Sequence, residues 1–240
     1  MSEPSPPEPV FNPNARVAMR RLGRELQPLV VVDDVLLNPD DMRAFALAQA
    51  YDAPPQGSYY PGRNGRLPPE YGTRLTLTLR PLLERVFGLP AFEALAHKGF
   101  FGVATTKPGD LQPLQAIPHF DSLDPKGIAT VHYFCGEPYR GTAFFRHEAT
   151  GFETIDARRV DAYRAKVFAE METLGEGSLA HVGRDMPFFT EIDYVEAVYN
   201  RLAIYRTTSL HAGILGETPL LDGASEGRLT ANGFIDIHRG

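Results

Sequence analysis

Two histidines and one aspartate in this chain have the residue types and the spacing of a metal site. His119 and Asp121 stand two positions apart in the segment Pro118-His119-Phe120-Asp121. In a strand, positions i and i+2 project from one face, so an imidazole nitrogen and a carboxylate oxygen can reach a single ion. His211 follows an apolar, strand-like run later in the chain and is the expected third ligand. Two histidines and one carboxylate on one side of an Fe(II) ion leave coordination positions open for reacting molecules.

A basic residue downstream is placed to bind an anion beside that metal. Arg228 follows a glycine and opens the segment Arg228-Leu229-Thr230, which has strand character. Its planar guanidinium can bind a carboxylate through two parallel hydrogen bonds. Thr230 is two positions further on, so it shares the face of Arg228 and can donate another hydrogen bond.

Three other histidines compete for the place of the third ligand. His132 lies in a run of large apolar and aromatic residues, which favours a hydrogen-bonded histidine of the core or of the pocket. His147 and His181 are flanked by polar, turn-like residues and stay open as alternatives. We interpret His211 as the ligand, because it comes directly after a strand-like run.

A segment rich in proline and glycine precedes these residues. From Asp52 to Pro69 the chain is expected to form a long irregular loop. Loops of this length often cover a binding site. Tyr59, Tyr60 and Arg63 are therefore the candidate substrate-binding residues of this loop.

The elements expected to position these residues are mainly strands, with a few helices around them. A helix is predicted to start at Pro39, with Asn38 as its N-cap and Asp40 and Asp41 in its first turn. The other predicted helices are 81–87, 90–97 and 156–174, the last ended by Gly175, and the strands lie within 28–36, 100–145 and 200–237, with Ile128 to Phe134 the clearest.

This order of elements predicts a mainly β fold with flanking helices. The expected architecture is a double-stranded β-helix, a cupin-like jelly roll whose mouth holds a ligand. Residues 1–15 are rich in Pro, Ser and Glu and are expected to form a disordered N-terminal tail. Residues 16–240 are expected to form a single domain with helical additions, because no repeat or break in composition divides them.

Charge and composition exclude several partners. The formal net charge is −6 and there is no run of Lys or Arg, so nucleic acid and anionic membranes are not expected to bind. The N-terminal segment lacks the basic start and apolar stretch of a signal peptide, and no window reaches the ~20 apolar residues of a spanning helix. The single Cys135 cannot form an internal disulfide, which fits a reducing compartment. We therefore expect a cytoplasmic protein.

The order of the chemistry-bearing residues resembles that of the 2-oxoglutarate/Fe(II)-dependent dioxygenase superfamily, most closely its prolyl-hydroxylase-like branch. The matching order is His119-x-Asp121, then His211, then Arg228. Four further segments resemble that branch and follow its order: residues 30–36, 38–41, 141–145 and 200–205. The resemblance extends over about residues 28–237.

Three features depart from the pattern of that superfamily. The tyrosine that usually bonds the cosubstrate would fall near Thr105 or Thr106. The loop between His211 and Arg228 is longer than usual. Phe234 stands near the place where nucleic-acid demethylases of the superfamily carry a second arginine, which argues against a nucleic-acid substrate.

The resemblance implies an enzyme, a 2-oxoglutarate-dependent dioxygenase that acts as a hydroxylase. His119, Asp121 and His211 would hold Fe(II), and Arg228 with Thr230 would bind the distal carboxylate of the cosubstrate 2-oxoglutarate. Oxidation of the substrate would be coupled to decarboxylation of 2-oxoglutarate to succinate. The substrate would be a peptide side chain, an amino acid or another small molecule, and a homodimer stays open.

Two other classes of function also stay open. A cupin-type metal enzyme that does not use 2-oxoglutarate would keep the three metal ligands but would have no need for Arg228. A non-catalytic jelly-roll binding protein would bind a partner through the tyrosine-rich loop and would leave the metal site empty or filled with zinc.

Overall fold

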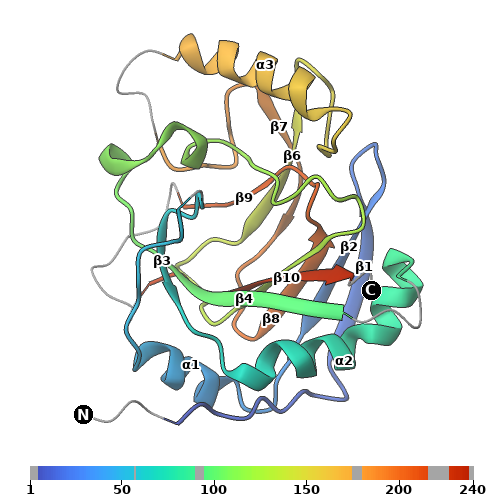
Figure 1. Ribbon diagram of the computed structural model, residues 1–240, viewed down its shortest axis with the longest axis vertical. Helices are drawn as coiled ribbons and strands as arrows, with labels where there is room; N and C mark the ends of the chain where they lie inside the picture. The colour runs from blue at the N-terminus through green and yellow to red at the C-terminus, as the bar shows by residue number, and fades with distance from the viewer. Residues whose placement is uncertain (1–4, 57, 90–94, 175–179, 216–226, 238–240) are drawn as a thin grey trace.

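The fold consists of two antiparallel sheets that pack face to face, with helices on the outside (Figure 1). The computed structural model describes residues 5–56, 58–89, 95–174, 180–215 and 227–237. Within these residues the strands are β1 Arg16–Leu22, β2 Gln27–Asp33, β3 Gly62–Gly65, β4 Leu95–Ala104, β5 Ile128–Tyr133, β6 Thr142–His147, β7 Phe189–Val195, β8 Arg201–Arg206, β9 His211–Gly213 and β10 Leu229–Ile237. The helices are α1 Pro39–Leu47, α2 Pro69–Phe87 and α3 Val160–Glu172, with short 3₁₀ turns at Pro108–Asp110 and Pro113–Gln115.

The strands are ordered so that the final strand lies inside the large sheet. The seven described strands of that sheet run in the order β1-β2-β8-β5-β10-β4-β3, and the three of the small sheet run β7-β6-β9. Thr230 of β10 pairs with Tyr133 on one side and with Gly102 on the other. Strand β10, which follows Arg228 directly, is thus held by hydrogen bonds along both of its edges.

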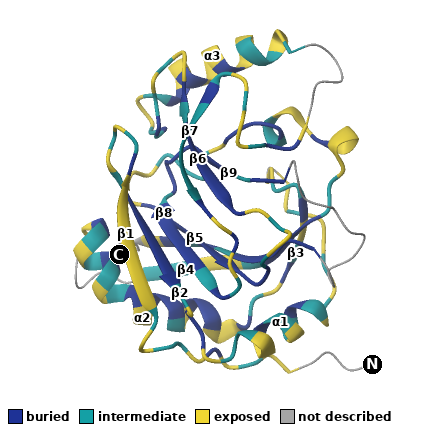
Figure 2. Cartoon of the chain, turned by 180° about the vertical axis from the view of Figure 1, so that it is seen from behind, coloured by how far each residue is buried: buried dark blue, intermediate teal, exposed yellow. Residues whose placement is uncertain are grey.

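Both faces of the large sheet are covered, which explains why its inner strands are apolar on both sides. On β5, Ile128 packs with the residues beneath α2, whereas Val131 and Tyr133 pack toward the small sheet. Figure 2 shows β2 and β8 buried and the edge strand β1 exposed. Helix α2 contributes an apolar stripe at intervals of four residues, the spacing that keeps side chains on one helical face: Tyr71, Leu75, Leu79 and Leu83.

The prediction of a mainly β fold with flanking helices is confirmed, but several predicted elements have different bounds. Helix α1 begins at Pro39 as predicted, although the Asn38 side chain makes no capping bond and instead accepts a hydrogen bond from the Val10 N–H. Helix α2 begins at Pro69, so the predicted start at 81 was wrong and Pro81 lies inside the helix. Of the predicted helix 90–97, residues 95–97 belong to β4 and the others lie outside the described residues. Gly175, the predicted end of the helix observed as α3, also lies outside them.

The described part of the N-terminal segment, residues 5–15, is held against the fold by backbone hydrogen bonds. The Asn12 N–H donates to the Val35 carbonyl at 2.9 Å, and the Leu37 N–H donates to the Val10 carbonyl at 2.8 Å. Phe11 packs against the core beneath α2. The sequence predicted disorder here, because its Pro and Glu content carries no sign of these long-range partners.

No helix in the described part of the chain combines the length and the apolar character needed to cross a membrane.

Candidate functional site

His119 and His211 are brought together by their own backbones. The His119 N–H donates to the His211 carbonyl at 2.9 Å, and the His211 N–H donates to the His119 carbonyl at 2.8 Å. This isolated antiparallel bridge holds the two ring centroids 4.4 Å apart. The Asp121 N–H donates to the Thr207 carbonyl at 2.8 Å, which holds the next same-face residue of the extended segment in place. The predicted ligands therefore converge, although His211 begins strand β9 rather than ending a strand.

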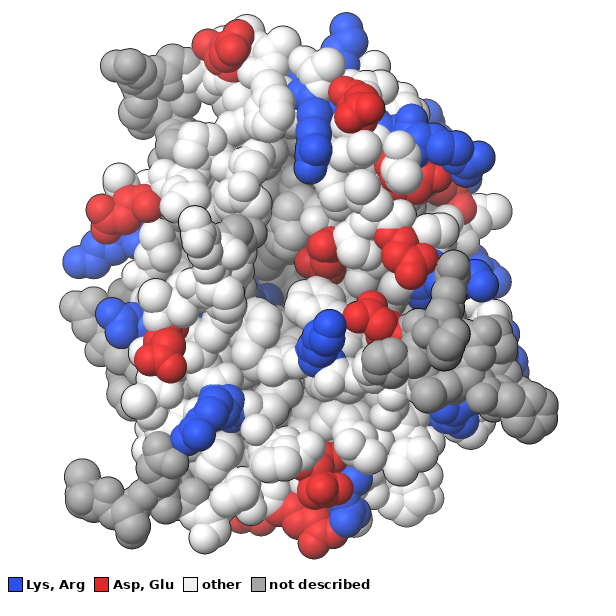
Figure 3. All heavy atoms as spheres, in the orientation of Figure 1, with Lys and Arg blue, Asp and Glu red and all other residues white. Residues whose placement is uncertain are grey.

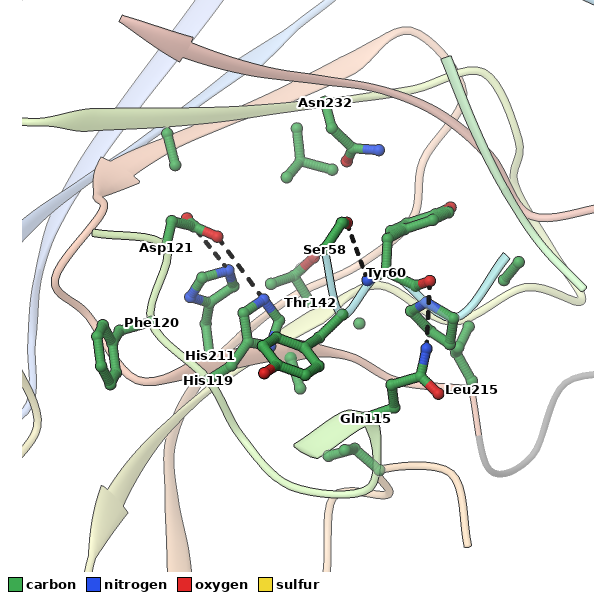
Figure 4. A pocket seen from close by; sticks show the side chains of 18 of the residues that line it. Ser58, Tyr60, Gln115, His119, Phe120, Asp121, Thr142, His211, Leu215 and Asn232 are labelled. Carbon is green, nitrogen blue, oxygen red and sulfur yellow. Dashed lines mark hydrogen bonds and ion pairs between the residues drawn. The ribbon is translucent and has the colours of Figure 1, made fainter. Parts of the chain in front are cut away.

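The three side chains surround a point that an ion can occupy. Oδ1 of Asp121 lies 3.7 Å from Nε2 of His119, and Oδ2 lies 3.6 Å from Nε2 of His211 (Figure 4). All the donor atoms lie within 4.8 Å of one another. Such separations are too long for hydrogen bonds, and they suit ligands that each stand about 2.0–2.2 Å from one shared ion. Oδ2 of Asp121 is buried and has no hydrogen-bond partner among the described residues, and a bound cation would give it a partner.

Local interactions and burial set the ionisation of these ligands. Nδ1 of His211 donates its proton to the Ser209 carbonyl at 2.9 Å, so Nε2 presents a lone pair toward Asp121. Burial lowers the pKa of His211 to about 4, which keeps the imidazole neutral at pH 7. Burial raises the pKa of Asp121 to about 6, partly offset by His119. The His119 side chain is 46% exposed and forms the open side of the group.

Arg228 is a buried cation that faces the same cavity. It is 5% exposed, and its Nε and Nη2 donate to the carbonyls of Arg140 and Gly141 at 2.8 and 3.0 Å. Among the described residues, no carboxylate forms an ion pair with it. A Cβ on Gly213 would stand 3.3 Å from Nη1, so the glycine keeps the space beside that nitrogen open.

Three hydroxyl groups are candidates to bind an anion together with Arg228, but the predicted one, Thr230, is not at the cavity wall. Thr230 is fully buried and exchanges hydrogen bonds with the Asn232 side chain at 3.0 and 3.2 Å, and it does not line the cavity. Thr142 does line it and accepts a hydrogen bond from Tyr133 at 2.7 Å, which leaves the Thr142 hydroxyl proton free to be donated. Tyr60 also lines the cavity, and its buried hydroxyl forms no hydrogen bond of normal geometry with a described residue, although Thr230 lies near it.

The cavity that joins these groups has a volume of about 310 Å³. The metal-ligand group and Arg228 both line it, and Ser58, Tyr59, Tyr60 and Pro61 contribute the loop side. In Figure 4, Tyr60, Gln115 and Leu215 lie across the pocket from Asp121 and Phe120. The face of the molecule in Figure 3 is hollowed near its middle, and basic and acidic side chains are interspersed around the hollow.

The three loop residues predicted to bind substrate differ in their position relative to the cavity. Tyr59 is 47% exposed and lines the cavity, whereas Tyr60 lines the same cavity with a buried hydroxyl. Arg63 belongs to β3, its guanidinium donates to the Tyr51 carbonyl at 3.3 Å, and it is not part of the cavity wall. The predicted loop thus lies on the same side of the fold as His119, and it is shortened by β3.

The rival histidines stand outside the metal-ligand group. His132 is buried in the core, accepts a hydrogen bond from Tyr71 at 2.9 Å and contacts Asn200 at 3.2 Å, as expected for a satisfied core histidine. His147 bonds Glu170 at 2.7 Å and ties β6 to α3. His181 lines the cavity without joining the ligands. Sequence reasoning missed Thr142 and this position of His181, because neither stands in a recognisable motif.

Residues 13–235 match the family described as DUF6445, a family of unknown function, and the chain belongs to it. No curated protein matches the chain in sequence. Two solved structures are similar to it. An N-substituted L-amino acid dioxygenase from Burkholderia ambifaria AMMD has 11% identity and a TM-score of 0.43, over 97% of this chain and 97% of that chain. An N-substituted L-amino acid dioxygenase of the same organism in complex with alpha-KG has 10% identity and a TM-score of 0.38, over 94% of this chain and 95% of that chain.

Proposed function

We propose that this chain is an Fe(II)- and 2-oxoglutarate-dependent dioxygenase with a double-stranded β-helix, related to the prolyl-hydroxylase-like branch. The proposed reaction is hydroxylation of a small molecule, an amino acid or a peptide side chain. The observation that carries the proposal is the buried Arg228, which forms no ion pair with any carboxylate of the described residues, in the same cavity as His119, Asp121 and His211.

The metal-ligand group fits Fe(II) by its chemistry. His119, Asp121 and His211 would hold the ion, since two neutral imidazoles and one carboxylate on one side form the donor set of non-haem iron oxygenases. When bound, iron would coordinate the keto acid and activate oxygen. The protein's own residues supply orientation of the reactants and a dry site.

Arg228 indicates that the second reactant is an anion. Burying a guanidinium without a carboxylate partner is costly, and the carbonyls of Arg140 and Gly141 compensate only part of its charge. A ligand carboxylate beside Nη1 would complete the pairing. A cosubstrate with a keto acid at one end and a carboxylate at the other would reach both the metal ligands and Arg228.

Two hydroxyl groups can bind the same carboxylate. Burial raises the pKa of Tyr60 to about 12, so its hydroxyl remains a donor at every physiological pH. Arg228 and Thr230 both lie close enough to Tyr60 to oppose this rise in pKa. Thr142 can donate from the small sheet. In this proposal Tyr60 and Thr142 take the role that the sequence assigned to Thr230.

The residues around Arg228 argue against the cupin-type alternative. A metal enzyme without 2-oxoglutarate would have no use for a buried arginine that has no acidic partner among the described residues. A non-catalytic binding protein would likewise have no need to keep this arginine beside three convergent metal ligands.

Calorimetric titration of 2-oxoglutarate into the Fe(II)-loaded protein, without oxygen, tests the proposal. We expect saturable binding well below millimolar concentration. Glutarate, which lacks the keto group, should bind more weakly, and metal-free protein should also bind 2-oxoglutarate more weakly. Admission of oxygen should then release succinate. If 2-oxoglutarate does not bind at millimolar concentration, the proposal fails.

A further inference from the structure

His181 is a buried imidazole in the cavity wall that the proposed chemistry does not use. It lies in the connection between α3 and β7 and is only 7% exposed. Among the described residues, the Thr106 backbone stands beside one ring nitrogen, and no residue bonds the other. Its neighbour Val182 accepts a hydrogen bond from the Leu215 N–H at 3.2 Å, which ties this connection to the segment after β9. Leaving a buried polar group unpaired is costly, so a partner is expected from the occupant of the cavity.

The surroundings of His181 restrict what that occupant can be. The described wall of the cavity carries two charged side chains, Asp121 and Arg228, and both are assigned to the metal and to the cosubstrate. The rest of the wall is mainly apolar and includes Leu114, Ile117 and Leu215. A second charged group on the occupant would therefore have no counter-ion in this wall, which disfavours charged substrates.

Building on the proposed function, we propose that His181 binds the substrate by accepting a hydrogen bond from an uncharged N–H or O–H group of a small, largely apolar molecule.

The ionisation of His181 supports the acceptor role. Burial lowers the pKa of the ring, and the backbone of Thr106 offsets this only in part. Because the Thr106 backbone raises the pKa, the group that contacts the ring is its carbonyl. A hydrogen-bond acceptor stabilises the protonated ring and so raises its pKa. A neutral ring with its proton toward that carbonyl has a lone pair on the other nitrogen. That nitrogen suits a donor such as an amide or a hydroxyl group, and it does not suit a carboxylate.

A series of small probes that share an isobutyl group and differ in their polar head group tests this assignment. The probes are isovaleramide, N,N-dimethylisovaleramide, isovalerate and isoamylamine, at millimolar concentrations suited to ligands of this size. Binding is followed by NMR, through the His181 ring Cε1–H signal and the methyl signals of Leu114, Ile117 and Leu215. The protein carries Zn(II) in place of iron, with 2-oxoglutarate present.

We expect isovaleramide to shift the His181 signal saturably. The other three probes should bind at least roughly tenfold more weakly, since each lacks the uncharged donor. His181→Phe keeps the bulk of the ring and should weaken isovaleramide roughly tenfold, as judged from the methyl signals. His181→Gln and His181→Asn offer an acceptor oxygen at different reach, and one of them should restore part of the affinity. Tyr199→Phe, whose hydroxyl bonds Asp40 outside the wall of this cavity, should leave it unchanged.

Three results would overturn the inference: tighter binding of isovalerate than of isovaleramide, equal binding of isovaleramide to the wild type and to His181→Phe, or no shift with any probe. The same titrations without metal and 2-oxoglutarate separate this inference from the proposed function. If 2-oxoglutarate fails to bind while isovaleramide still shifts His181, the proposed function fails and the His181 site stands. If 2-oxoglutarate binds and isovaleramide does not contact His181, the proposed function stands and the His181 inference fails.

Discussion

The carbonyl of Ser209 accepts the Nδ1 proton of His211 at 2.9 Å, and this one hydrogen bond decides which nitrogen of the imidazole faces Asp121. The two residues are two positions apart, so the ring is oriented by its own segment of the chain and not by a distant element. Because His211 is buried, its other nitrogen keeps its lone pair in a place that water hardly reaches. This orientation would prepare the proposed metal ligand before any ion arrives.

Removal of one ligand should abolish tight Fe(II) binding. His211→Ala or Asp121→Asn is expected to weaken Fe(II) binding by about 100-fold or more. Loss of a metal ligand should reduce the affinity at least as much as loss of a residue that hydrogen-bonds a ligand. Anaerobic calorimetry with Fe(II) measures this. His181→Phe alters the same cavity without touching the ligands, so it should retain full affinity. Full iron content in His211→Ala would show that another residue is the third ligand.

Arg228 should control 2-oxoglutarate and not iron. Arg228→Ala is expected to weaken 2-oxoglutarate by about two orders of magnitude, since charge-assisted hydrogen bonds contribute roughly 1.5–3 kcal/mol each. Arg228→Lys should restore only part of the affinity, because an ammonium group lacks the planar fork. Calorimetry on the Fe(II) protein measures both variants. Arg63→Ala, at the surface of the same region, serves as the control, and an equal loss there would contradict the assigned role.

The two adjacent tyrosines should behave differently. Tyr60→Phe removes a buried hydroxyl beside Arg228 and is expected to weaken 2-oxoglutarate roughly tenfold, the value of one hydrogen bond. Tyr59→Phe changes a half-exposed side chain and should have no such effect. Titration of both variants with 2-oxoglutarate makes the comparison. Similar affinities for the two variants would remove Tyr60 from the carboxylate site.

The buried His132 should make the fold less stable in acid. Burial lowers its pKa from 6.5 to about 4. As the pH falls from 6.5 to 4, the unfolded chain therefore takes up a proton that the folded chain refuses, and the free energy of unfolding decreases. The loss reaches on the order of 3 kcal/mol below the folded pKa.

Urea unfolding at a series of pH values measures this effect. His132→Gln removes the titrating group. The slope of the unfolding free energy against pH should therefore be smaller than in the wild type, by an amount that corresponds to the uptake of up to one proton on unfolding. Identical slopes for the two proteins would show that His132 is not the group that titrates.

The ligand group could be predicted from sequence because its information is local. His119 and Asp121 share a face through their spacing, and His211 follows a strand-like run in a short turn. The role of Thr142 and Tyr60 depends on how two sheets and a loop meet, which no spacing within one segment encodes. Thr230 was chosen because it shares the face of Arg228, and that argument could not show that Asn232 occupies its hydroxyl.

Helix α2 illustrates a different kind of failure. Its apolar stripe is present in the sequence from Tyr71 onward, but the prolines around Pro69 suggested a loop, and Pro81 suggested a new start. Proline at the first turn is in fact compatible with a helix, and packing of the stripe on the large sheet holds the helix together across Pro81. Tertiary burial overrode the local signal.

The position of β10 between β4 and β5 affects how the protein folds during synthesis. During synthesis from the N-terminus, β4 and β5 leave the ribosome before the strand that joins them, so the large sheet stays in two parts until β10 inserts. Pairings between segments so distant in sequence form slowly. Arg228 arrives with that same strand. Closure of the sheet and completion of the proposed anion site therefore occur in one late step, so we expect a nascent chain that has not finished folding to bind no anion there.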